Sequence, residues 1–182
     1  MESESKSMSR RTIAIAAVLS VLALGSPLVN ANANPLANNL FSSGVDKYKQ
    51  GDYQGAIADF TRAVEINPEF AAAYNNRGYA KYNLKDYQGA IADYDKAIEN
   101  NPQDEIVYLN RGVAKYNLKD YKGAIADLDK YIEINPHHAN PYYYSGLARE
   151  LANDLEGACD DWRKAADLGD ERSAERVKKQ CL

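Results

Sequence analysis

The 182-residue sequence predicts an all-α fold, a solenoid in which four helical hairpins stack in a row and a final helix caps the stack. The first observation is a repeat: segments 71–104 and 105–138 share 23 of 34 residues. The second is that glycine recurs with the same step of 34 residues, at Gly44, Gly78, Gly112 and Gly146. The third is that apolar residues within each unit recur at steps of three and four, the spacing of one helix face. A fixed step of this length indicates one small helical unit copied along the chain.

The step divides the chain into units of residues 37–70, 71–104, 105–138 and 139–170. In the third unit, the pattern predicts one helix over 104–118 and a second over 121–134. Lys119-Asp120 forms the turn between them, and Asn135-Pro136 ends the second helix. Gly112 and Ala124 are small at the place where the two helices must cross closely. Residues 34–38 are expected to be a short disordered linker before the repeat domain, which spans 39–182.

Residues 1–33 predict a secretory signal peptide. An apolar run from Ile13 to Leu24 follows Arg10-Arg11, and the small-residue segment Ala31-Asn32-Ala33 follows the run. The run is too short to span a bilayer comfortably, so we expect cleavage after Ala33 and no stable membrane anchor. The protein is then expected in the periplasm or outside the cell, or in the thylakoid lumen if the source is photosynthetic. Translation from Met8 and export by the twin-arginine route remain open alternatives.

The chain has two cysteines, Cys159 and Cys181, and export would take both to an oxidising compartment. Cys159 occupies the place of an isoleucine in the earlier units and should face the next helix. Ala174, Val177 and Cys181 form a stripe on an expected capping helix of about 171–181. The sequence therefore predicts a disulfide between Cys159 and Cys181.

Charge and motifs exclude several classes of function. Without residues 1–33 the chain keeps 19 basic and 24 acidic residues, which argues against nucleic acid or an anionic membrane as partner. The sequence lacks a phosphate-binding glycine loop, a nucleophile elbow and a His-Glu-x-x-His motif, so we expect no enzyme and no cofactor. His137 and His138 stand alone in a turn, which does not predict a metal site.

The repeat resembles the tetratricopeptide repeat (TPR), and the second unit shows the signature best. Its residues at the signature places are Tyr74, Gly78, Tyr82, Tyr87, Ala90, Tyr94, Ala97 and Pro102. The resemblance covers about 37–170 and is of the kind found in cyanobacterial and other bacterial arrays. Some residues depart from the pattern: Arg77 and Arg111 replace the usual leucine, Ser43 and Ser145 do so in the outer units, and Tyr131 stands at an alanine place. Arg77 is expected to pair with Asp59 or Asp93, and Arg111 with Asp93 or Asp127.

The resemblance implies that the first helix of each unit lines a concave groove that binds a peptide or protein segment. Carried over by place in the repeat, the groove residues are Phe41, Val45, Tyr48, Asn75, Asn76, Tyr79, Tyr82, Asn83, Leu109, Asn110, Val113, Tyr116, Asn117, Tyr143, Tyr144 and Leu147. The repeat itself accounts for ten of the 14 tyrosines as packing residues, Tyr94 among them. Four tyrosines remain, and three of them, Tyr79, Tyr143 and Tyr144, are groove residues to test; the fourth is Tyr131.

One TPR subgroup holds the C-terminal carboxylates of heat-shock chaperones with Lys and Arg on this face. The corresponding places here are Phe41, Val45, Asn76, Ile106 and Asn110, so a carboxylate clamp is not expected. The sequence instead predicts a neutral or basic partner with apolar or aromatic anchors, bound by an exported adaptor or assembly factor. The alternative is a solenoid that self-associates as a homo-oligomer, with Leu40 and Phe41 at its uncovered first unit.

Overall fold

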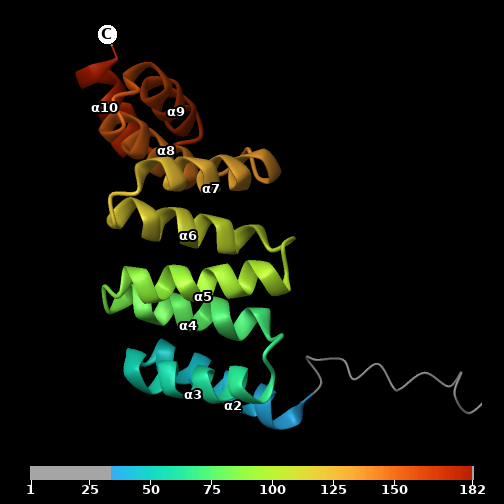
Figure 1. The fold of residues 1–182 in the computed structure, drawn as a ribbon. Helices are drawn as coiled ribbons and strands as arrows, with labels where there is room; N and C mark the ends of the chain where they lie inside the picture. Colours follow the sequence, from blue (N-terminus) through green and yellow to red (C-terminus); the bar gives the residue numbers. More distant parts are fainter. Residues whose placement is uncertain (1–33, 182) are drawn as a thin grey trace, which may run out of the picture.

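The computed structural model describes residues 34–181, and every regular element within that range is a helix (Figure 1). In chain order the helices are α2 Pro35–Lys49, α3 Tyr53–Ile66, α4 Ala71–Asn83, α5 Tyr87–Asn100, α6 Glu105–Asn117, α7 Tyr121–Ile134, α8 Ala139–Leu151, α9 Leu155–Asp167 and α10 Glu171–Gln180. The predicted signal peptide lies outside the described residues. None of the helices within 34–181 is both long and apolar enough to cross a lipid bilayer.

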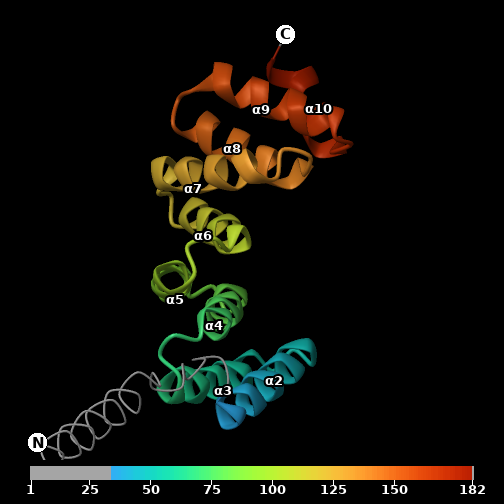
Figure 2. The same ribbon diagram turned by 90° about the vertical axis from the view of Figure 1, so that its right-hand side faces the viewer.

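The helices form hairpins that stack along one axis, as two perpendicular views show (Figures 1 and 2). Each hairpin pairs a first helix with a second helix: α2 with α3, α4 with α5, α6 with α7, and α8 with α9. Helix α10 packs on α9 at the C-terminal end. The predicted all-α solenoid is therefore confirmed, and the second helix of the third unit begins and ends where the sequence places it.

The expected disordered linker at 34–38 is wrong, because all but the first of these residues belong to α2. The Asn34 side chain accepts hydrogen bonds from the backbone N–H groups of Leu36 and Ala37 and so caps the helix. Pro35 occupies the first turn, where its missing N–H has no helical partner to lose. Ala37 is fully buried, so tertiary contacts hold this first turn in place.

The turn inside each hairpin follows one design. An aspartate caps the second helix and accepts a hydrogen bond from the backbone N–H of the glycine three residues on, as Asp86 does from Gly89 at 2.9 Å. The residue before the aspartate has a positive φ, which is 63° at Lys85 and 80° at Gly51. Glycine adopts that conformation at no steric cost, whereas Lys85 is held there by the surrounding turn.

The two helices of a hairpin cross where the repeated glycine stands. A Cβ atom built on Gly78 would lie 2.8 Å from Cε1 of Tyr94 and 3.1 Å from the backbone oxygen of Ala90. The large side chain below each glycine changes from unit to unit: the corresponding residues are Phe60, Tyr94, Leu128 and Trp162, all fully buried. The crossing therefore needs a small residue on the first helix and a large apolar body on the second.

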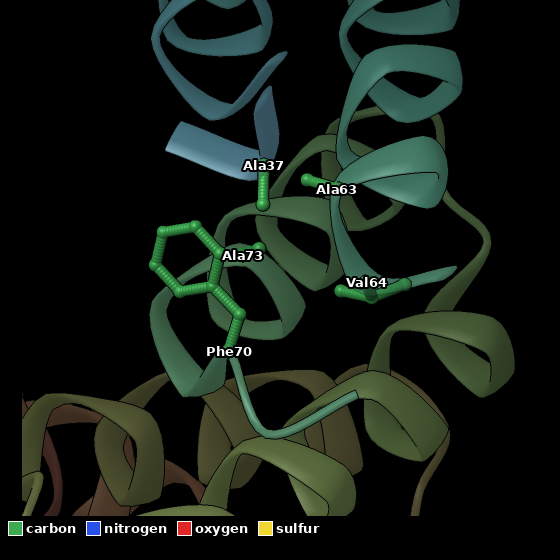
Figure 3. Close-up of a cluster of buried hydrophobic side chains, with 5 residues drawn as sticks. All are labelled: Ala37, Ala63, Val64, Phe70 and Ala73. Atoms are coloured by element: carbon green, nitrogen blue, oxygen red, sulfur yellow. The ribbon is translucent and has the colours of Figure 1, made fainter. Parts of the chain in front are cut away.

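Neighbouring hairpins share buried clusters, and Figure 3 shows the cluster between the first two units. Ala37 of α2, Ala63 and Val64 of α3, and Ala73 of α4 meet around the ring of Phe70 (Figure 3). Each helix alone would leave this surface in water, so stacking is what buries it.

The first helices lie on the inner side of the stack. Helices α2, α4, α6 and α8 contact one another directly from unit to unit, whereas α3, α5 and α7 are joined mainly through the first helix that follows each of them. Shorter separations between first helices place them on the concave side, the surface that repeat solenoids use for binding.

The C-terminal end is closed by the predicted disulfide. Cys159 of α9 and Cys181 at the end of α10 are bonded, with Cα atoms 5.5 Å apart. Cys159 is 5% exposed and lies in a cluster with Leu147, Ala158 and Trp162, against which Val177 of α10 also packs. The disulfide thus fastens the capping helix to the last unit.

Candidate functional site

The inner face is hollowed where α4, α6 and α8 meet. The hollow has a volume of about 290 Å³ and is lined by Tyr79, Tyr82, Tyr94, Leu109, Asn110, Val113, Asn140 and Tyr144. Six of these eight were predicted groove residues. They come from three consecutive units, so the hollow exists only in the assembled stack.

The remaining predicted groove residues lie outside this hollow. Six of them take part in core clusters: Phe41, Val45 and Tyr48 in the first units, and Tyr116, Tyr143 and Leu147 near the disulfide. The Tyr143 ring is covered by the guanidinium of Arg172 from the capping helix, 3.9 Å from the ring centroid. Tyr143 and Tyr144 are adjacent in sequence but serve different surroundings, since only Tyr144 lines the hollow.

Asparagine side chains connect first helices of adjacent units along the inner face. Asn83 donates to the hydroxyl of Tyr48 at 3.0 Å, and Asn117 donates in the same way to Tyr82 at 3.2 Å. Asn110 donates to Oδ1 of Asn75 at 3.1 Å. Asn76 bonds the backbone oxygen of its own helix, at Ala72. These bonds fix the spacing of the first helices and hold the tyrosine rings in place.

Pairs of aromatic rings from adjacent units lie in contact on both sides of the hollow. The rings of Tyr48 and Tyr79 lie 5.4 Å apart between centroids, and those of Tyr116 and Tyr144 lie 6.0 Å apart. Burial, with help from neighbouring hydroxyls, raises the pKa of Tyr48 to about 12. Burial also raises the pKa of Tyr82 and Tyr116. The hydroxyl groups therefore keep their protons near neutral pH and can act as hydrogen-bond donors.

The basic residues of the first helices are held by aspartates on the second helices. Arg77 binds both carboxylate oxygens of Asp93, at 2.9 and 2.6 Å, and Lys81 binds the same carboxylate at 2.8 Å. Arg111 makes the same bidentate contact with Asp127. For each arginine the structure selects one of the two predicted partners, and the structural role of these cations is confirmed.

Each arginine also reaches the preceding unit. Arg77 donates to the hydroxyl of Thr61 at 3.2 Å, and Arg111 to the carboxylate of Asp95 at 2.7 Å. In the last unit Arg149 binds Asp129 of the preceding unit at 2.9 Å, because Ser145 stands where an arginine would be. The arginines therefore join adjacent units and are not available to a ligand.

Two residues of the hollow were missed by the sequence reasoning. The repeat predicts a packing role for Tyr94, and its ring does pack under Gly78, yet the residue also lines the hollow. Asn140 occupies the second place of its unit, one of the groove places of the resemblance, although it was not carried over. The available signal for Tyr94 was its hydroxyl, which Phe60 and Leu128 at equivalent places do without.

The two histidines remain outside this site. Nδ1 of His138 lies 2.6 Å from the hydroxyl of Tyr131, a buried residue of α7. Within residues 34–181 no group of three or more His, Cys, Asp or Glu side chains is arranged to hold a metal ion.

Comparisons with known proteins agree with this geometry. Two family models described as tetratricopeptide repeat match consecutive segments, residues 41–105 and 106–138. A crystal structure of MamA is 26% identical, covers 79% of this chain and 84% of its own, and superposes with a TM-score of 0.71. MamA from Desulfovibrio magneticus RS-1, from residue 41 to its end, is 24% identical over 75% of this chain and 77% of its own, with a TM-score of 0.72.

A third solved structure is the first TPR of Spaghetti (RPAP3) bound to the HSP90 peptide SRMEEVD. It is 26% identical, covers 66% of this chain and 94% of its own, and has a TM-score of 0.60. No curated protein sequence matches the chain significantly. The likeness is therefore to a class of helical repeat proteins.

Proposed function

The chain belongs to the tetratricopeptide repeat family, and we propose that it binds a segment of another protein in the groove formed by its first helices. The observation that carries the proposal is the hollow, because residues from three units converge there on one space of about 290 Å³. A solenoid that served only as a spacer would need no such convergence.

The chemistry of the hollow favours an apolar or aromatic anchor on the partner. Tyr79, Tyr82 and Tyr144 offer large rigid contact surfaces with hydroxyl groups, while Leu109 and Val113 provide aliphatic walls. None of the eight residues that line it is Lys or Arg. The excess of acidic over basic residues in the chain is consistent with a neutral or basic partner segment.

The RPAP3 structure supports a peptide ligand while indicating a different recognition chemistry. The peptide bound in that structure ends in Glu-Glu-Val-Asp, a strongly acidic sequence. The arginines of this chain's inner helices are occupied by Asp93 and Asp127 instead. We propose that this chain binds its partner in the same groove as the RPAP3 domain but prefers neutral or basic segments with aromatic anchors to acidic ones.

We further propose that the protein acts in an exported compartment as an adaptor or assembly factor. The apolar run Ile13–Leu24 and the Ala31-Asn32-Ala33 segment support export, and the Cys159–Cys181 disulfide suits an oxidising environment. Mass spectrometry of the protein from its native source should find an N-terminus at residue 34. A chain that retains residues 1–33 in the cytoplasm would refute the export proposal.

Pull-down from an envelope fraction tests binding by the groove. The protein is compared with the Tyr79→Ala/Tyr144→Ala variant and with Lys96→Ala/Lys130→Ala, a control in which both changed side chains are exposed on second helices. A specific partner should be retained by the protein and the control and lost by the groove variant. Equal recovery by all three would show that the groove is not the binding surface.

Self-association is the second candidate, and one observation favours it. Leu36 of α2 is 57% exposed at the end of the stack, beside Leu40 and Phe41, which are partly buried against the first core cluster. A second copy could cover this edge. Light scattering that finds only a monomer at high protein concentration excludes this candidate.

A further inference from the structure

Tyr94 carries a hydroxyl group that its place in the repeat does not require. The corresponding residues Phe60 and Leu128 fill the same helix crossing with hydrocarbon alone, and both are fully buried. The ring of Tyr94 also fills its helix crossing, since it lies directly under Gly78. Packing therefore explains the ring and leaves the hydroxyl unexplained.

The hydroxyl of Tyr94 is buried and has no hydrogen-bond partner among the described residues. Leaving such a group unpaired costs about 1–3 kcal/mol, so replacement by phenylalanine would be the simpler solution for stability alone. Trp162, at the same place in the last unit, also has an unpaired ring nitrogen, but it does not line the hollow. Tyr94 is one of the residues that line the hollow, so its unpaired hydroxyl belongs to the wall of this site, and a small shift of the side chain would be needed to bring it into contact with a bound group.

The hydroxyl acts as a donor. Burial, above all, raises the pKa of Tyr94, and Tyr79, Tyr82 and Asp93 raise it further. No lysine or arginine lines the hollow, so an anionic ligand would find no charged partner there. The group that fits is therefore a neutral acceptor.

The size of the hollow limits what can carry that acceptor. A cavity of about 150 Å³ holds one benzene molecule, and this hollow has about 290 Å³. It can hold one aromatic side chain and part of the backbone that bears it. Leu109, Val113 and the rings of Tyr79, Tyr82 and Tyr144 would surround the apolar body of such a side chain.

We propose that the hollow is a specificity pocket for a tyrosine side chain of the partner protein, whose hydroxyl accepts a hydrogen bond from the hydroxyl of Tyr94. This inference rests on the proposed function, since it names the anchor that the groove takes. Tyrosine combines the three required properties: an aromatic body, a neutral acceptor at its tip and no charge. Phenylalanine would fill the space and leave Tyr94 unpaired.

Two probes that differ only at the ring tip test the proposal. N-acetyl-tyrosine amide carries the hydroxyl, and N-acetyl-4-methylphenylalanine amide replaces it with a methyl group of similar size. Binding of each is followed by the methyl NMR signals of Leu109 and Val113, which line the hollow. The proteins compared are the unmodified protein, Tyr94→Phe and Tyr108→Phe. Tyr108→Phe removes a hydroxyl that bonds the oxygen of Pro102 away from the hollow.

In the unmodified protein, the tyrosine probe should bind about threefold to tenfold more tightly than the methyl probe, as expected for one net hydrogen bond. The ratio should fall to one or below in Tyr94→Phe and stay unchanged in Tyr108→Phe. Thermal unfolding of Tyr94→Phe should be unchanged or shifted upward, because Phe60 shows that the ring alone suffices.

Equal ratios in the unmodified protein and in Tyr94→Phe would overturn the proposal, as would the absence of saturable shifts with either probe. Failure of the proposed function has a different signature, namely equal pull-down by the protein and its Tyr79→Ala/Tyr144→Ala variant. Partner capture that depends on the groove, together with a flat probe ratio, would refute only the tyrosine pocket.

Discussion

Reduction of the Cys159–Cys181 disulfide should loosen one end of the molecule and leave the rest unchanged. The bond closes a loop of 23 residues, from residue 159 to residue 181. On the chain-entropy estimate, a loop of this length stabilises the closed state by about 3 kcal/mol. Because 1.4 kcal/mol corresponds to a factor of ten, its loss should make local opening about 100-fold more frequent.

The effect should be confined to the C-terminal end, where α8, α9 and α10 contact one another. In a solenoid each element contacts only its neighbours, so a loss at one end is not transmitted along the stack. Helix α10 packs on α9, where the disulfide attaches it covalently, and it reaches α8 through the Arg176–Glu150 ion pair and through Arg172, which lies on the ring of Tyr143. The buried group around Trp162 is the one that opening would expose.

Amide hydrogen exchange read by mass spectrometry measures this directly, with and without reductant. Protection in α9 and α10 should fall by up to about 100-fold, while peptides from α4 to α7 keep their rates. The variant Cys159→Ala/Cys181→Ala is the control and should not respond to reductant. Uniformly faster exchange along the whole chain would refute the reasoning, because it would show that the stack unfolds as one unit.

Two further predictions concern the aspartates of the second helices. Asp127→Ala should lower the free energy of unfolding in urea by about 2–3 kcal/mol, because it strips Arg111 of a bidentate, charge-assisted partner. Asp95→Ala removes a half-exposed partner of Arg111 and should cost under about 1 kcal/mol; equal losses would contradict this ranking. Burial alone would raise the pKa of Asp59, but hydrogen bonds from Lys47 and Ser43 outweigh it and lower the pKa below its usual value. The folded state therefore gains stability from ionised Asp59 above about pH 4 and loses this stability as the pH falls further. The free energy of unfolding in urea should depend less on pH in Asp59→Asn than in the unmodified protein. Identical pH profiles for the two proteins would refute this.

The fold could be predicted from the sequence because the repeat copies every local signal. Capping aspartates, crossing glycines and buried alanines recur at the same places, so each unit supports the interpretation of the next. The linker was predicted wrongly because it lies before the first full unit, where no copy guided the interpretation. There, Asn34 as a cap and Pro35 at the first turn were the signals of a helix start.

The inner face was predictable only in part. The repeat gives the direction of a side chain from its place in the unit, and this placed six of the residues that line the hollow. It does not say which neighbours cover a side chain, and Tyr143 illustrates this, since Arg172 of the capping helix lies on its ring. Tyr94 was missed because one residue both packs a crossing and lines the hollow, and a repeat template assigns each place a single role.

The arginine contacts make the junctions between units unequal in strength from one end of the array to the other. At the first junction Arg77 donates to an uncharged acceptor, the hydroxyl of Thr61, whereas the arginines at the next two junctions form ion pairs with Asp95 and Asp129. The far end is further fastened by a covalent bond. When the two ends are pulled apart, the first hairpin should therefore detach before the others. The part of the hollow that the last two units form should then stay folded.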